Sequence, residues 1–173
     1  MNKKIIKTTL DPKELNRAIK EIKAYKKRII SKALELRERV AEELMSEAQN
    51  GFNSAVMEDL LNSGGRIPEA TVSLREKGNI TLVIASGEDA IWCEFGSGVY
   101  FNAPAGVSPH PKGAELGMTI GDYGKGYGQR NVWGYYDNGE LKLTHGTRTQ
   151  MPMFNAMLAV SQKISQIAKE VFS

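Results

Sequence analysis

The chain has 173 residues, 41% of them hydrophobic, which predicts one ordinary domain over 1–173 with a real core and excludes a wholly disordered protein. Its 23 Lys and Arg residues against 20 Asp and Glu leave a net charge of +3, too small to identify a partner. A single cysteine, Cys93, excludes an internal disulfide and a cysteine-based zinc finger. No apolar run approaches the roughly 20 residues of a membrane helix, so no membrane contact is expected.

The first third of the chain is predicted to be one long helix that follows a short arm, residues 1–10. Asp11 suits the N-cap and Pro12 suits the first helical position. Apolar residues then recur at steps of three and four as far as Asn50-Gly51, which we interpret as the helix stop. A helix over residues 12–49 would be about 57 Å long at ~1.5 Å per residue. Because a domain of this size cannot cover such a length, the helix either bends or packs on a neighbouring subunit.

The charges of this helix are polarised, with bases in its first half and an excess of acids between residues 33 and 49. A run of this kind is typical of a solvated helix face; the sharper alternatives are a head-to-tail subunit contact and a basic rim close to DNA. Tyr25 is the only aromatic residue in the basic half, so base-specific recognition is not supported. The candidate residues facing a subunit or DNA are Lys13, Arg17, Lys20, Lys23, Lys26, Lys27, Arg28 and Lys32.

Shorter elements are predicted beyond the long helix. Residues 53–61 are expected to form a second helix. Residues 69–77 alternate between apolar and polar, and with the more apolar residues 80–86 they predict a hairpin around Gly78-Asn79. A short helix carrying Ala90, Ile91, Trp92 and Phe95 follows, with a cap offered by Gly87-Glu88-Asp89.

Residues 102–131 are predicted to be a loop rich in Gly and Pro, and loops of about this length are typically functional or disordered. A second hairpin is expected from residues 132–136 and 140–144, and Pro152 opens a last amphipathic helix. The order of elements predicts an α+β domain. In it, the long N-terminal helix and the C-terminal helix pack on a small antiparallel sheet of about four strands.

No group of residues predicts an active site. Cys93 has apolar neighbours and an acid beside it, which raises the pKa of a thiol and favours an inert core role. Ser97 lacks the spacing and the preceding strand of a nucleophile elbow. His110 and His145 have no clustered acids in the sequence, and the glycine-rich residues 121–128 lack the ending of a phosphate-binding loop. We therefore predict no enzymatic activity, no catalytic or metal-binding residues and no cofactor.

Glu94 lies among aromatic residues in the stretch 90–100, AIWCEFGSGVY. A carboxylate in such surroundings is costly unless it is paired or hydrogen-bonded. We interpret Glu94 as an acid that locks the following turn by accepting bonds from the backbone of Gly96 to Gly98. The alternative is a salt bridge between subunits, to Arg130 or Arg148.

Three features in this order resemble one protein family. The first is the long charged helix followed by a hairpin. The second is Trp92-Cys-Glu-Phe-Gly-Ser-Gly98, which resembles an aromatic-x-Glu-Phe-Gly-Thr-Gly signature with Ser97 in place of Thr. The third is TRTQMPMFNAML, residues 147–158, which resembles the entry to the family's C-terminal helix. The family is the tail-completion, or head–tail joining, minor tail proteins of long-tailed phages and prophages. The matching residues are Trp92, Glu94, Phe95, Gly96, Ser97 and Gly98 in the signature and Gly146, Pro152, Phe154 and Ala156 in the C-terminal motif.

The resemblance implies a non-enzymatic structural protein of the virion tail or neck, made in the cytoplasm of the host bacterium. It implies a homo-oligomeric ring, expected to be a hexamer, between the head connector and the tail-tube proteins. DNA would pass through the lumen without sequence-specific binding. Residues 102–131 are longer than expected for the family, which leaves their role open. The alternative hypothesis is a small basic nucleic-acid-binding protein that uses the Lys- and Arg-rich first helix.

Overall fold

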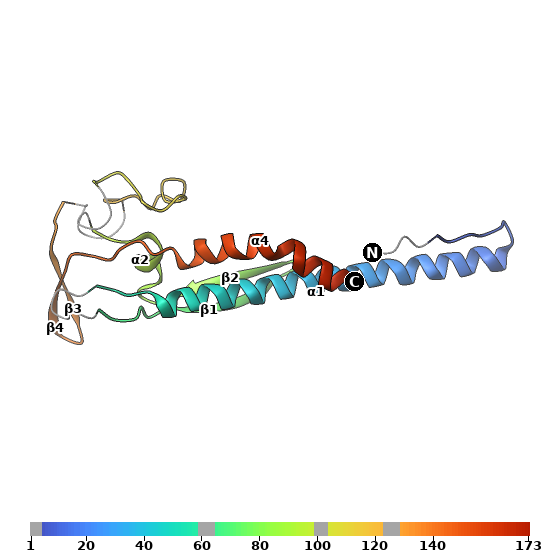
Figure 1. Cartoon of the computed structure of the whole chain (residues 1–173), viewed down its shortest axis with the longest axis horizontal. Coiled ribbons are helices and arrows are strands. Elements are labelled where there is room, and N and C mark those ends of the chain that lie inside the picture. Colours follow the sequence, from blue (N-terminus) through green and yellow to red (C-terminus); the bar gives the residue numbers. More distant parts are fainter. Residues whose placement is uncertain (1–4, 59–64, 99–103, 123–128) are drawn as a thin grey trace.

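The computed structural model describes residues 5–58, 65–98, 104–122 and 129–173. The molecule is elongated, and α1 runs through most of its length (Figure 1). The predicted α+β class, with a long N-terminal helix and a C-terminal helix, is confirmed. The elements are α1 Pro12–Ser54, β1 Thr71–Lys77, β2 Ile80–Ser86, α2 Ala90–Phe95, β3 Trp133–Asp137, β4 Glu140–Thr144 and α4 Pro152–Phe172.

The helix α1 is continuous over 43 residues and begins as predicted, with the Asp11 side chain accepting a bond from the Glu14 N–H at 3.2 Å. The predicted stop at Asn50-Gly51 is wrong, because the helix continues to Ser54. The short helix predicted over residues 53–61 is also wrong: residues 53 and 54 end α1, the described residues 55–58 are not helical, and 59–61 lie outside the described chain.

Gly51 serves close packing and not helix termination. A Cβ atom at this position would lie 2.9 Å from the Cβ atom and 3.2 Å from the Cα atom of Pro152, the first residue of α4. No real Cβ contact is that short without movement of a neighbour, and here the neighbour is partly backbone. The absent side chain of Gly51 therefore lets the start of α4 lie directly against α1.

The second half of α1 packs on α4 and on the β1–β2 hairpin, and Figure 1 shows α4 running antiparallel beside it. Lys163 of α4 bonds to Glu43 at 2.7 Å and to Glu47 at 2.6 Å. The Gln49 side chain joins α1 to the hairpin, since its amide oxygen accepts the Val72 N–H at 2.8 Å. The main buried cluster lies between these elements and consists of Ala48, Phe52, Ala55, Met57, Val72, Ala90, Cys93 and Ala156.

The predicted single sheet of about four strands is wrong. Among the described residues, β1 pairs only with β2 and β3 only with β4, giving two separate two-stranded antiparallel sheets. Both predicted hairpins do form, and the second turns through Asn138 and Gly139, whose positive φ angles of 49° and 85° suit a tight hairpin turn. The first hairpin lies along α1 and the second lies at the end of the molecule (Figure 1), so their edges do not meet.

The first half of α1 projects beyond α4 and the β1–β2 hairpin, and the described part of the arm runs back beside it (Figure 1). Arg37 bonds to Glu76 near the hairpin tip at 3.1 Å, and Arg39 bonds to Glu170 near the end of α4 at 2.7 Å. We call residues 12–36, which lie beyond these contacts, the stalk, and the described residues from 37 onward the body. The expectation of a helix longer than its own domain can cover is confirmed.

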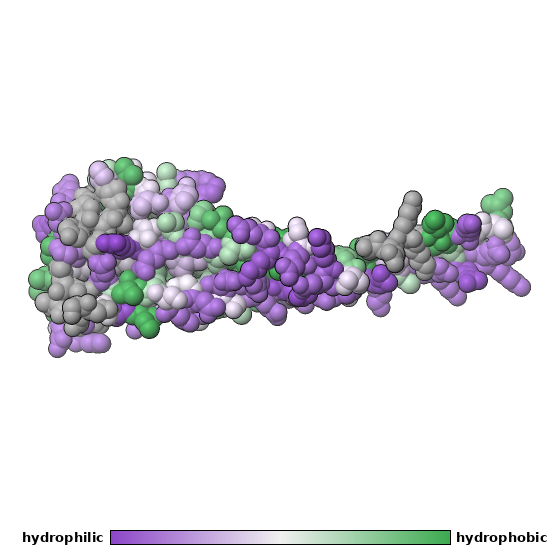
Figure 2. Space-filling model, viewed as in Figure 1, coloured by the Kyte–Doolittle hydropathy of each residue, from purple (hydrophilic) through white to green (hydrophobic). Residues whose placement is uncertain are grey.

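Apolar side chains of the stalk are strongly exposed even though they recur at helical spacing. The described part of the arm, residues 5–10, is bonded to the stalk through Thr9 and Glu14, and Ala18 of the stalk is buried. Figure 2 shows how narrow the stalk is beside the body. The exposed apolar residues of the stalk are Leu15, Ile19, Ile22, Tyr25, Ile30 and Leu34, with exposures between 36% and 56%.

Replacement of Gly51 tests the close approach of α4 to α1. Leu is a better helix former than Gly, so Gly51→Leu would stabilise an isolated helix by nearly ~1 kcal/mol. We expect the opposite in this protein, a loss of about 1–3 kcal/mol, because the added side chain displaces Pro152. Urea unfolding measures the change, with Ser46→Leu on an exposed position of the same helix as the control. Equal stability of wild type and Gly51→Leu would contradict the packing role.

Candidate functional site

The two sequence motifs that carry the family resemblance lie side by side in the structure. The Ser97 N–H donates to the Thr147 carbonyl at 2.8 Å, and the Thr147 N–H donates back to the Ser97 carbonyl at 3.1 Å. The Gln150 N–H donates to the Cys93 carbonyl at 3.0 Å. We call this meeting of residues 93–98 with residues 145–154 the junction. It joins the end of α2 to the start of α4 across more than 50 residues of sequence.

Glycines make the junction possible. Gly98 and Gly146 have φ angles of 81° and 97°, a region that side-chain-bearing residues rarely adopt. A Cβ atom at Gly146 would lie 2.1 Å from the Ser97 carbonyl oxygen, and one at Gly98 would lie 2.4 Å from the Trp133 side chain. The backbones and Trp133 therefore occupy the space that side chains would need.

Glu94 caps the N-terminus of α4. Its Oε2 accepts the Met153 N–H at 2.8 Å, and its Oε1 accepts the Phe154 N–H at 3.0 Å. Met151, the residue at the N-cap position of α4, supplies no side-chain cap of its own. A carboxylate satisfies these two free donors and lies at the positive end of the helix dipole. The side chain is almost wholly buried, with 7% of the residue exposed.

The prediction that Glu94 accepts bonds from the backbone of Gly96–Gly98 is wrong, although its prediction as a hydrogen-bonded buried acid is confirmed. Among the described residues its bonds run to the start of α4 and to His110. The alternative, a salt bridge to Arg130 or Arg148 of another subunit, stays a prediction. Arg148 lies 3.5 Å from the Glu58 carboxylate. The physical reason is that the start of α4 offers two unpaired N–H groups in a buried place, and this demand cannot be seen from residues next to Glu94 in sequence.

His110 completes the surroundings of Glu94. Its Nδ1 accepts the Lys112 N–H at 3.0 Å, so the ring proton lies on Nε2, which donates to Glu94 at 3.1 Å. The ring lies between Phe95 and Phe154, with centroid separations of 4.5 Å and 5.1 Å. The sequence places His110 between Pro109 and Pro111 but does not indicate its contact with Glu94, which lies 16 residues earlier.

His110 belongs to a folded part of the predicted long loop. Residues 104–122 contain no helix or strand, as expected, but they are held by backbone bonds such as Gly106 N–H to Ile120 at 2.7 Å and Ile120 N–H to Val107 at 3.0 Å. Ile120 is buried. Residues 102–103 and 123–128 of the predicted loop lie outside the described chain. The described part is therefore fastened to the junction through His110.

Asp89 anchors the other end of α2. Its carboxylate accepts two bonds from the Arg66 guanidinium, at 2.5 and 2.8 Å, and one from the Glu69 N–H at 2.8 Å. Burial raises the pKa of Asp89, but the bonds from Arg66 and Glu69 outweigh this effect and hold the pKa below its ordinary value. Asp89 occupies the N-cap position of α2 without bonding to that helix through its side chain.

The side chains of the junction that carry reactive groups are buried or hydrogen-bonded. Burial, together with the negative charges of Glu94 and Asp89, raises the pKa of the Cys93 thiol to about 12, so the thiol is protonated at neutral pH. The Ser97 hydroxyl accepts the Thr147 N–H at 3.0 Å. Within the described ranges, no three His, Cys, Asp or Glu residues gather as a metal site would require. No helix there has the length and apolarity to span a bilayer.

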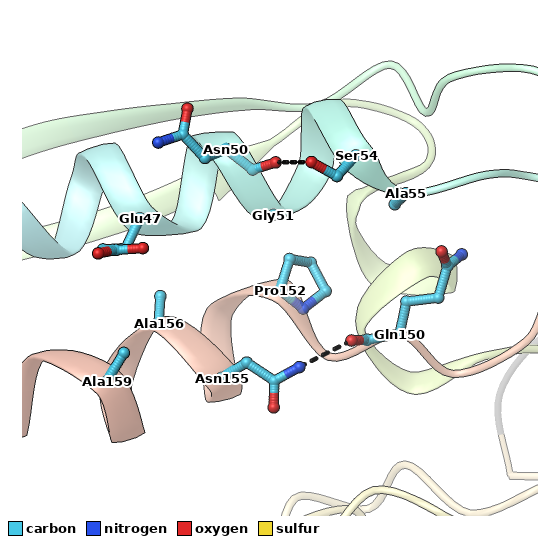
Figure 3. Close-up of a pocket in the computed structure, with 10 residues that line it drawn as sticks. All are labelled: Glu47, Asn50, Gly51, Ser54, Ala55, Gln150, Pro152, Asn155, Ala156 and Ala159. Atoms are coloured by element: carbon cyan, nitrogen blue, oxygen red, sulfur yellow. Dashed lines mark hydrogen bonds between the residues drawn. The ribbon is translucent and has the colours of Figure 1, made fainter.

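A shallow groove of about 440 Å³ lies beside the junction, between α1 and α4 (Figure 3). Its wall includes the Gln150 side chain, whose amide bonds both the N–H and the carbonyl of Val56, at 3.0 and 2.9 Å. In Figure 3, Pro152, Ala156 and Ala159 of α4 lie opposite Glu47 and Gly51 of α1. The lining residues are Glu47, Asn50, Gly51, Ser54, Ala55, Gln150, Pro152, Asn155, Ala156 and Ala159.

The structure separates the two sets of predicted site residues. The signature and C-terminal motif residues gather at the junction, whereas the eight basic candidates lie on the stalk, toward the other end of the molecule (Figure 1). Arg17 is paired with Glu21 at 3.5 Å and Lys32 with Glu35 at 3.2 Å, both within the helix.

Comparison with models of protein families, with curated proteins and with solved structures found no match to this chain.

Loss of the Glu94 carboxylate tests the cap on α4. We expect Glu94→Ala to lower the free energy of unfolding by about 2–4 kcal/mol, because two N–H groups and His110 lose a buried charged partner. Glu88→Ala removes an exposed acid six residues earlier and is the matched control. Chemical denaturation followed by circular dichroism gives both values. A Glu94→Ala protein as stable as the control would contradict the capping role.

The Arg66–Asp89 pair predicts a pH-dependent stability. Because the pKa of Asp89 is lowered on folding, its contribution is present above the ordinary value of 3.8 and is lost as the pH falls through the folded-state pKa. We expect Asp89→Asn to cost about 1–2 kcal/mol at pH 7, a modest value because Arg66 is partly exposed. The difference from wild type should shrink below pH 4. Unfolding curves across pH measure it, and a difference that is constant with pH would contradict the role of the charge.

Proposed function

We propose that this chain is a non-enzymatic structural protein that acts in phage head–tail joining or tail completion and assembles as a ring at the connector–tail interface. The observation that carries the proposal is the stalk, the first 25 residues of the 43-residue helix, in which six large apolar side chains are exposed. Repeated contacts between one surface and a different surface of the next copy close a ring when the rotation allows.

The junction supports the same proposal from a different side. The signature and the C-terminal motif belong to one structural unit, in which Glu94 caps α4 and the glycines permit close backbone contact. Their residues therefore have a common physical purpose, which is to fix α2 and α4 together. This accounts for an acid, a thiol, a hydroxyl and a histidine in one place without chemistry on a substrate.

Nucleic-acid binding through the stalk is the second candidate. The observation in its favour is that seven of the eight basic candidates are exposed, with only Lys32 half-buried. Such a surface attracts phosphate groups, and the resulting affinity falls steeply as salt rises. The stalk shows no aromatic platform for bases beyond Tyr25, so any such binding would be insensitive to sequence.

The two candidates differ in what the purified protein does alone. The ring proposal predicts a rise in mass with protein concentration in size-exclusion chromatography with light scattering, and ring-shaped particles by electron microscopy. It also predicts weak binding to a short labelled duplex in fluorescence anisotropy. In a phage or prophage whose copy of the gene is deleted, heads and tails should accumulate separately. A strict monomer that binds DNA tightly at low salt would favour the second candidate and contradict the first.

A further inference from the structure

We propose that the stalk of one copy lies in the groove between α1 and α4 of the next copy, so that the subunits join head to tail. This inference rests on the proposed assembly and specifies its two contact surfaces. The apolar side of the stalk is one surface. The other is the groove of Figure 3, bordered by the Lys163–Glu43 and Lys163–Glu47 ion pairs.

The charge of the chain is divided between its stalk end and its body. Residues 1–36 carry 11 Lys and Arg residues against four acids, whereas residues 37–173 carry 12 against 16. The stalk end is therefore strongly positive and the body is negative. Contact between the stalk of one copy and the body of another brings opposite charges together, but contact between two stalks brings two positive segments together. Charge complementarity thus selects a head-to-tail arrangement.

The stalk has the two-sided pattern of a helix that docks in a groove. Leu15, Ile22 and Ile29 recur every seven residues along one side. Lys13, Lys20 and Lys27 recur at the same spacing about half a turn away. With the apolar side in the groove, these three lysines point away from it, while bases at the flanks can reach acids of the neighbouring body. Helices bound in grooves use anchors at this kind of spacing.

The groove can take a short stretch of such a helix. Ala159 has only a methyl side chain on the groove wall, so Ile and Leu side chains of the stalk can come close to α4 there. The lining residues of α4 run from Pro152 to Ala159, which is roughly 12 Å of helix, so the groove would hold about two turns of the stalk. Glu47 lies on the groove wall and offers an acceptor to a basic side chain of the incoming stalk.

Mixing of two half-defective variants tests the arrangement. Ile19→Glu/Ile22→Glu places two acids on the apolar side of the stalk and leaves the groove unchanged. Ala159→Arg fills the groove with a larger side chain and leaves the stalk unchanged. Each variant alone should be monomeric in light scattering, because a head-to-tail contact needs both surfaces. An equimolar mixture should give a particle of twice the monomer mass, since one good stalk then meets one good groove. In each variant alone, the association constant should fall roughly tenfold or more.

Control variants separate the contact from general effects of charge and of folding. Ala24→Glu/Ser31→Glu adds the same two charges on the opposite side of the stalk, and Ser165→Arg adds the same base on α4 outside the groove. Both should assemble like wild type. Asn155→Arg, at an exposed position of the groove wall, repeats the groove test if Ala159→Arg unfolds, as judged by circular dichroism.

Each outcome has a distinct meaning. A groove variant that assembles like wild type overturns the inference but leaves the ring proposal standing, as does a mixture of folded variants that stays monomeric. A wild-type protein that is monomeric at all concentrations overturns both. Association should also weaken as salt rises, because the charges of the stalk and the body are opposite. Association that strengthens with salt would indicate pairing of two stalks and would overturn the head-to-tail contact.

Discussion

The fold depends on one carboxylate placed at the start of α4. A helix begins with N–H groups that have no partner within it, and a buried start needs an acceptor from elsewhere. Pro152 removes one of these donors, and Glu94 of α2 satisfies two more. The same carboxylate accepts from His110, which brings in residues 104–122. One side chain thus ties together three segments that are distant in sequence.

Glu94 can reach the start of α4 because glycines let neighbouring segments of the chain approach closely. Gly51 lets Pro152 lie against α1, and Gly98 and Gly146 let the two chain segments of the junction meet beside Trp133. Each glycine would usually be explained by flexibility or by a turn. Here Gly98 and Gly146 have positive φ angles, and at all three glycines a neighbouring atom lies where a Cβ atom would be. The close contacts at these glycines hold α2 and α4 where Glu94 can cap α4, and the cap in turn holds α4 in place.

The sequence predicts local structure well and distant partners poorly. Apolar spacing locates α1 and α4, and the Gly78-Asn79 and Asn138-Gly139 turns locate both hairpins, because these signals lie within a few residues. Gly51 was misread as a stop because its reason, Pro152, is about 100 residues away. The partners of Glu94 are likewise distant. Pairing of hairpins into one sheet or two depends on which edges meet, and alternation within a strand carries no information about that.

The body and the stalk differ in how far their side chains are satisfied within the chain. In the body, the potentially reactive groups that sequence alone draws attention to, at Cys93, Glu94 and His110, are buried and bonded or protonated. In the stalk, apolar side chains from Leu15 to Leu34 remain in contact with water along about 30 Å of helix. Exposed apolar stripes of this length are costly unless a partner covers them. The body therefore satisfies its polar groups within the chain, whereas the stalk leaves apolar surface open, and this difference is why we propose the assembly contact at the stalk.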